Sequence, residues 1–199
     1  MNQKIKRILM PILGWLGIFL FIVSILFEAL PLMRGNALNT FHLIARQRVF
    51  EQRIVTDVLT LAYRPEEEHP EALSELQTAL PVWEKVQNGL QKGDDSLGIS
   101  PNLPNNVKLY LLQMQPDFSY MDTAARQILA HHDPVDPDQV VIILQHEQSY
   151  YLSMAQAVIL FQDDIDNAAK IYFSIELGIG IALMSIWIVF LFSFQRSKS

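Results

Sequence analysis

Residues 38–54 read LNTFHLIARQRVFEQRI, a stretch with apolar residues at helical spacing and with neither glycine nor proline. On a helical wheel of about 100° per residue, one broad apolar arc contains Leu38, Phe41, Ala45, Val49, Val55 and Leu59. Arg48 lies inside this arc, and Glu51 lies on one of its flanks. Arg46 and Arg53 lie together on the other flank. The stretch therefore predicts an amphipathic helix that carries one arginine on its buried side.

The rest of the chain between residues 36 and 170 also reads as helical almost throughout. Its apolar spacing predicts four helices, with the third interrupted near Pro116, over residues 36–63, 71–92, 105–130 and 138–170. The connections are rich in glycine, proline, asparagine and aspartate, which favour irregular turns. Four helices with such connections predict an all-α fold, an antiparallel four-helix bundle.

Two long uncharged runs flank this bundle, over residues 8–27 and 177–194. A helix needs about 20 apolar residues to cross the hydrocarbon core of a bilayer. We therefore predict transmembrane helices over residues 8–32 and 171–194, in contact with membrane lipid. A cleaved signal peptide is the alternative for the first run. An uncleaved anchor fits better, because the apolar part of a signal peptide has roughly 7–15 residues and no Ala-x-Ala site follows here.

The charges around these runs predict their orientation. Residues 1–7 contain three basic residues and residues 195–199 contain two, and neither segment contains an acid. The positive-inside rule places both segments in the cytoplasm. Residues 34–170 hold 10 basic and 19 acidic residues, a net charge of −9. We expect a two-pass protein of a bacterial inner membrane, with residues 36–170 as an extracytoplasmic (periplasmic or extracellular) domain.

The first and fourth helices of the bundle are expected to continue into the two transmembrane helices. A bundle of this kind is long and narrow, so one copy has a limited core. Pairing of two copies through the first and fourth helices would bury more surface. We therefore expect a homodimer.

Arg48 needs a partner, because burial of a guanidinium costs several kcal/mol unless a carboxylate, carbonyl groups or an anion compensates it. One interpretation is structural: a salt bridge to an acid on a neighbouring helix, or a side chain that extends to solvent. The other is functional, because the planar fork of guanidinium donors suits small planar oxyanions. Two copies of Arg48 across a dimer axis would hold one monovalent anion between them.

The run LIARQRVFEQRI, residues 43–54, resembles the signature of the N-terminal domain of type IV pili methyl-accepting chemotaxis transducers, the PilJ-like family. The positions that match this signature are Leu43, Arg46, Gln47, Arg48, Gln52 and Arg53. This family is related to the outer sensor domain of nitrate- and nitrite-responsive histidine kinases of the NarX type. The resemblance extends more weakly over residues 36–170 and implies a helical sensor bundle.

The resemblance also implies a site. The arginine that binds the anion at the dimer interface of the nitrate-sensing relatives corresponds to Arg48, with Arg46, Arg53 and His42 as further candidate ligand-binding residues. The sequence departs from the family at two positions, because His42 stands where asparagine is usual and Glu51 where serine is usual. Glu51 lies one turn from Arg48, where its carboxylate would either pair with the guanidinium or repel nitrate.

Other motifs carry less chemistry. Residues 131–133, His-His-Asp, lie in a proline-rich loop and favour a helix turn over a metal site. His146 begins an HExxH-like run, but Tyr150 stands where zinc needs the second histidine. The aspartates at 163–166 indicate a solvated surface rather than a cation site. No catalytic set, metal site or cofactor motif is evident, and the acidic outer domain excludes nucleic acid as a partner.

These features predict a membrane-anchored dimeric sensor or receptor, not an enzyme. It would detect a small ligand, such as nitrate, or a partner outside and pass a helix shift across the membrane. The alternative is a two-span scaffold or interaction subunit of a membrane protein complex, with no small-molecule ligand. Because 199 residues leave no room for an output module, we expect either a fragment of a longer receptor or a complete protein that signals to a membrane partner.

Overall fold

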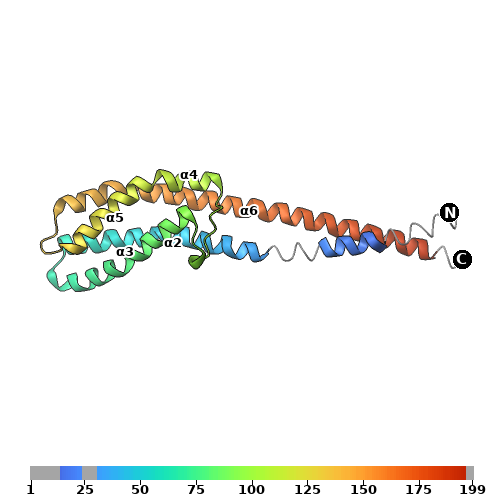
Figure 1. Cartoon of the computed structure of the whole chain (residues 1–199), viewed down its shortest axis with the longest axis horizontal. Helices are drawn as coiled ribbons and strands as arrows, with labels where there is room; N and C mark the ends of the chain where they lie inside the picture. Colours follow the sequence, from blue (N-terminus) through green and yellow to red (C-terminus); the bar gives the residue numbers. More distant parts are fainter. Residues whose placement is uncertain (1–13, 24–30, 196–199) are drawn as a thin grey trace. The chain divides into compact units, whose positions relative to one another are not determined.

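The computed structural model describes residues 14–23 and 31–195 (Figure 1). The chain divides into two compact units. One unit is Gly35–Ile165, and the other combines Met1–Arg34 with Asp166–Ser199. The predicted division into membrane helices, outer domain and cytoplasmic ends stays a prediction.

The described residues are almost entirely helical. The helices are α2 (Pro31–Tyr63), α3 (His69–Lys92), α4 (Asn105–Gln113), α5 (Gln115–Ala130) and α6 (Pro137–Gln195). Short 3-10 helices, η1 (Glu66–Glu68) and η2 (Asp95–Leu97), lie in two of the connections. No strand is found in the described ranges, where the only β-type contacts are two isolated bridges in loops. The predicted all-α class is confirmed.

The helix boundaries follow local signals in the sequence. The third predicted helix is divided at Met114 into α4 and α5, because Pro116 occupies the first turn of α5 and has no backbone N–H to continue the ladder. The fourth predicted helix and the second predicted apolar run form one uninterrupted helix, α6. The first apolar run lies partly outside the described residues.

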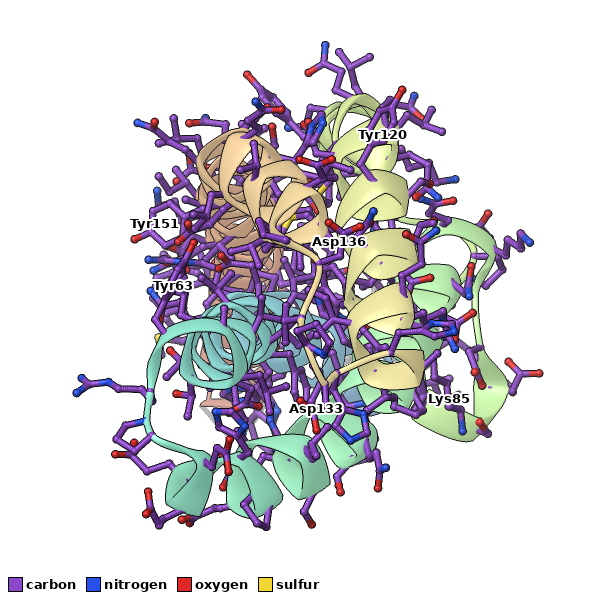
Figure 2. All side chains as sticks on the ribbon, turned by 90° about the vertical axis from the view of Figure 1, so that its left-hand side faces the viewer. Tyr63, Lys85, Tyr120, Asp133, Asp136 and Tyr151 are labelled. Carbon is purple, nitrogen blue, oxygen red and sulfur yellow. The ribbon has the colours of Figure 1, made fainter. Side chains whose placement is uncertain are left out.

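The unit Gly35–Ile165 packs around one apolar core to which α2, α3, α4, α5 and α6 all contribute. Figure 2 views this unit along its helices and shows α2, α3, α5 and α6 around a shared interior. Trp83 of α3 lies at the centre, with its ring centroid 4.5 Å from that of Phe118 of α5. The same ring lies 5.3 Å from Tyr150 of α6. One indole therefore joins three helices.

The apolar arc predicted for the first helix coincides only in part with its buried side, because Val55 is buried and Phe41 and Leu59 pack against the core. Leu38 and Val49 are 54% and 63% exposed. The buried stripe of α2 instead contains Thr40, Ile44, Gln47, Glu51, Ile54, Val55, Asp57, Val58 and Leu61. The prediction missed this stripe because it contains polar residues, of which Gln47 finds hydrogen-bond partners on α3 and α6. Arg48 accordingly lies half-buried at the edge of the core, and Glu51 is fully buried.

The long connection after α3 is hydrogen-bonded to the beginning of α2. Asp94 caps η2, with its Oδ1 accepting hydrogen bonds from the backbone N–H groups of Ser96 and Leu97 at 2.8 and 3.2 Å. Gly93, at φ +84°, approaches Pro101 so closely that a Cβ would lie 2.9 Å from it. The loop reaches α2 where Asn39 Nδ2 donates to the Leu97 carbonyl at 2.6 Å. This contact ties the beginning of α2 to the connection.

Among the described residues, one helix is long and apolar enough to cross a membrane. It lies within Pro137–Val189, and its most apolar window has a mean hydropathy of 1.8. A shorter apolar helix spans Gly14–Val23. Most large apolar side chains of Gly14–Val23 and of the second half of α6 are exposed, Trp15 and Trp187 among them.

Candidate functional site

All four residues expected at the ligand site lie on α2, but the structure divides them between two faces. His42, Arg46 and Arg53 lie within about 40° of one another around the helix, since each residue advances the helix by about 100°. Arg48 is about 120° away from His42 and faces α6. The four residues therefore do not form one cluster within a single chain.

Arg48 is held by Tyr151 of α6. Its Nη2 donates a hydrogen bond to the Tyr151 hydroxyl, and its Cζ lies 4.3 Å from the centre of the tyrosine ring. Its Nε is buried and has no hydrogen-bond partner. None of the ion pairs between described side chains involves Arg48. The guanidinium thus has an aromatic partner and no carboxylate partner in the part of the chain described here.

Arg46 and Arg53 line a different feature, a groove of about 360 Å³ between α2 and α3. Arg53 is already paired there, because its Nε donates to Glu75 Oε2 at 3.1 Å and its Nη2 contacts the other carboxylate oxygen. Arg46 lies over the Phe50 ring, 5.8 Å from its centroid. His42 is exposed and has its ring edge-on to Phe41. These three residues form an exposed basic face of α2 that is separate from Arg48.

Beneath Arg48 the core contains a hydrogen-bonded polar cluster. Trp83 Nε1 donates to the Tyr150 hydroxyl at 3.0 Å. That hydroxyl lies 3.2 Å from Gln47 Oε1 and 3.4 Å from Gln87 Oε1, the two acceptors available to it. Gln47 Nε2 donates to the Trp83 carbonyl at 3.3 Å. The cluster links α2, α3 and α6, and every member is fully buried.

Glu51 lies on the same buried stripe of α2, one turn after Gln47. It is 0% exposed, and neither carboxyl oxygen has a hydrogen-bond partner. The pKa of Glu51 is raised to about 7, chiefly by burial and also by the charge of Glu147, while Arg48 opposes the rise. No hydrogen bond or ion pair joins Glu51 to Arg48. A large share of Glu51 side chains is therefore neutral near pH 7, which reduces the negative charge beside Arg48.

Asp57 is the second buried acid of α2. It is nearly fully buried, and its Oδ2 has no partner. The pKa of Asp57 is raised to about 7, chiefly by burial and also by the neighbouring Glu75, while Arg53 opposes the rise. The helix thus carries two acids that ionise only at an unusually high pH.

A third group of polar residues joins α5 to α6. His146 Nδ1 lies 2.7 Å from Asp117 Oδ1, and Ser149 Oγ donates to Asp117 Oδ2 at 2.7 Å. Tyr120 stacks on the His146 ring with centroids 4.5 Å apart. The serine is bonded to the aspartate and not to the histidine, which is not the nucleophile–base contact of covalent catalysis. Within residues 14–23 and 31–195, no group of three His, Asp or Glu side chains could hold a metal ion.

Sequence reasoning did not find the partners that matter here, Tyr151, Tyr150, Trp83 and Gln87. The spacing of Thr40, Gln47 and Glu51 on one helical face was a readable signal. That signal does not say which helix supplies the partners, since Tyr150 and Tyr151 lie 103 residues from the α2 atoms they contact.

Comparison with known families agrees with the resemblance in the arginine-rich run. Residues 45–142 match the PilJ family model, described as the type IV pili methyl-accepting chemotaxis transducer N-term. The chain contains a PilJ domain. No curated protein matches the chain, and no solved structure does.

The PilJ match confirms the predicted resemblance, and the relation to NarX-type sensors stays a prediction. The matched range begins inside α2 and ends in the first turns of α6, so it includes Arg46, Arg48 and Arg53 and begins after His42. PilJ domains are the sensory part of chemotaxis transducers rather than enzymes. The PilJ domain of this chain is therefore a chemotaxis-type sensor domain.

Proposed function

We propose that the chain is the input part of a membrane-anchored, dimeric receptor in which Arg48 binds a small oxyanion such as nitrate. The observation that carries this proposal is the state of the Arg48 side chain. Its guanidinium is half-buried against Tyr151, has no carboxylate partner among the described residues and keeps a buried Nε without an acceptor. An arginine in this state retains hydrogen-bonding capacity for an anion.

The ring of Tyr151 would orient the guanidinium of Arg48 before the ligand binds. Stacking on an aromatic ring fixes the plane of the guanidinium, and arginine binds planar anions best when this fork is already oriented. Arg48 uses one N–H of Nη2 to reach the Tyr151 hydroxyl, and its Nε is buried, which leaves Nη1 and the second N–H of Nη2 for a ligand. A monovalent anion shared by two copies of Arg48 would lower the charge of the pair from +2 to +1, which reduces the repulsion between two half-buried cations.

The exposed apolar residues beside this site support a dimer. Val49 follows Arg48 on α2 and Leu152 follows Tyr151 on α6, and both are exposed. Leu152 shares its face of α6 with Val141 and Ile159, which are also exposed. Two-fold pairing through α2 and α6 would cover these residues and bring two copies of Arg48 to one anion.

The membrane arrangement belongs to the same proposal. We place the antiparallel four-helix bundle outside the cytoplasmic membrane, with Gly14–Val23 in one transmembrane helix and the second half of α6 in the other. The exposed apolar side chains of these segments suit a lipid environment. Since α6 is a single helix from Pro137 to Gln195, a shift of its outer part would be transmitted along its length to a membrane signalling partner.

The test is calorimetric titration of the full chain in lipid nanodiscs with nitrate, nitrite and, as a weakly coordinating control, chloride. We expect saturable nitrate binding with one anion for two chains, abolished by Arg48→Ala and weakened by Arg48→Lys, which keeps the charge but loses the fork. Arg46→Ala is the matched control, because it removes an exposed arginine from another face of the same helix. Binding that survives Arg48→Ala would overturn the assignment of the site to Arg48. The absence of binding to every small anion would overturn the proposal and favour the scaffold alternative.

A further inference from the structure

The buried stripe of α2 is unusually polar, and the whole carboxyl group of Glu51 within it lacks a hydrogen-bond partner. Of the five buried polar or charged residues in the described ranges, four lie on α2: Thr40, Gln47, Glu51 and Asp57. Gln47 is hydrogen-bonded within the polar cluster. Glu51 is completely buried, and both of its carboxyl oxygens lack a partner.

An ionised carboxylate in this position is costly. Removal of a carboxylate from water costs many kcal/mol unless hydrogen bonds or a counter-charge replace the lost solvation. A neutral carboxylic acid loses much less, so the packed arrangement of helices favours the protonated form. Proton release from Glu51 and the packing around it are therefore linked, and each affects the other.

The charged surroundings of Glu51 reinforce this linkage. Arg48 precedes it by one turn on α2, and from α6 it is faced by Glu147 and Tyr150. The buried residues of α3, α4 and α5 include no titratable side chain. Arg48 is the cation that lowers the pKa of Glu51, but its guanidinium is hydrogen-bonded to Tyr151 and not to the Glu51 carboxylate. A second acid, Glu147, opposes ionisation.

We propose that the domain has protons as a second input, with Glu51 as the proton-binding group. Protonated Glu51 holds α2 against α3 and α6 in the packing described above. Ionised Glu51 needs water or a direct contact with Arg48. Either response loosens the packing of α2 against α6, because water must enter the core or Arg48 must leave Tyr151. This function stands apart from the anion site, because it depends on the buried carboxyl and on no added ligand.

Trp83 provides a local reporter of this movement. It is fully buried and belongs to the polar cluster that contacts Gln47, one turn from Glu51 on α2. The chain has three tryptophans, so substitution of Trp15 and Trp187 by phenylalanine leaves Trp83 alone. Acrylamide quenching of this single-tryptophan full chain would be measured in nanodiscs between about pH 5 and pH 8, without nitrate.

We expect quenching of Trp83 to increase as pH rises, with a midpoint near the Glu51 pKa of about 7. Glu51→Gln should remove this transition and keep the poorly quenched state throughout. Asp57→Asn removes the other acid of α2 that has a raised pKa, and it should leave the transition in place. A flat profile in the parent chain, or an unchanged transition in Glu51→Gln, would overturn the proposal.

A second variant keeps the proposal testable if Glu51→Gln does not fold. Glu147 is only half-buried on α6, and its charge raises the Glu51 pKa. Glu147→Gln should therefore shift the quenching midpoint to lower pH. A midpoint that does not move would show that Glu51 is not the titrating group. Because nitrate is left out of this experiment, either result is independent of nitrate binding at Arg48.

Discussion

The guanidinium of Arg48 lies over the ring of Tyr151, with 4.3 Å between Cζ and the ring centroid, and the two side chains also share a hydrogen bond. This contact joins α2 to α6 across 103 residues of sequence. Figure 2 shows Tyr151 at the outer side of the unit rather than in its interior. The proposed anion site is therefore built from two helices whose relative position it can report.

Tyr151→Phe should weaken nitrate binding without abolishing it. The ring that orients Arg48 remains, but the hydroxyl that holds Nη2 is lost, and one hydrogen bond is worth about 1 kcal/mol, or roughly a fivefold change in Kd. Titration calorimetry of the full chain measures this change. Tyr63→Phe is the control, because Tyr63 is an exposed tyrosine at the end of α2. Equal effects of the two substitutions would contradict a specific role for Tyr151.

The two proposed inputs should be coupled. Ionised Glu51 attracts Arg48, which is why Arg48 opposes the rise of the Glu51 pKa. An anion on Arg48 removes that opposition, so anion binding should promote proton uptake and acidity should strengthen anion binding. The Kd for nitrate should therefore fall between about pH 8 and pH 6. In Glu51→Gln the Kd should be independent of pH over this range, and a retained pH dependence would assign the coupling to another group.

Asp57→Asn should stabilise the chain at alkaline pH. The folded pKa of Asp57 is about 7 against an ordinary value of 3.8, so the folded state binds the proton more tightly than the unfolded state. Its stabilising contribution is complete below pH 3.8 and is lost progressively as pH rises to about 7. The gain from asparagine should therefore grow over this window and level off above it. Urea unfolding followed by circular dichroism measures this difference.

Tyr150→Phe should lower the free energy of unfolding by about 1–3 kcal/mol, because it leaves buried donors and acceptors of Trp83, Gln47 and Gln87 without a partner. Tyr120→Phe is the matched control, since Tyr120 is exposed and keeps its stacking on His146 after loss of the hydroxyl. Chemical unfolding of both variants at one pH separates the two effects. A loss in Tyr150→Phe no larger than in the control would show that the cluster adds little stability.

The proposed dimer face can be tested by oxidation, because the chain contains no cysteine. Val49→Cys places one thiol on the exposed face of α2 beside Arg48, and it should form a disulfide-linked dimer in the membrane. Leu109→Cys places an equally exposed thiol on α4, away from the proposed face, and should remain monomeric on a non-reducing gel. Cross-linking of the second variant alone would place the interface elsewhere.

Much of the helical framework was readable from the sequence. Residues 36–63 were expected as the first helix and α2 ends at Tyr63, while the irregular segment after Lys92 and the break near Pro116 also occur where the sequence indicated. These features depend on local turn residues and apolar spacing. The buried face of α2 was not readable, because Leu38 and Val49 offer an apolar face as good as that of Ile44 and Ile54. Only distant partners decide between the two.

The same limit applies to the candidate site. The arginine-rich run drew attention to Arg48, and the family comparison covers it. Its partner Tyr151 could not be inferred, because nothing in either segment specifies which residues of α2 and α6 meet. The burial of Glu51 likewise depends on the packing of α3 and α6 around it. Pairings between distant helices are properties of the assembled core and have no local signature.

The polar cluster has a consequence for how α2 can travel. Apolar side chains tolerate small displacements with little loss of contact, but hydrogen bonds weaken steeply with distance and angle. Gln47 meets the Tyr150 hydroxyl and the Trp83 carbonyl in one axial position of α2. An intermediate displacement would break these bonds and leave the groups unsatisfied. The helix should therefore have one favoured axial position. We expect it to leave that position in a discrete step rather than by gradual sliding.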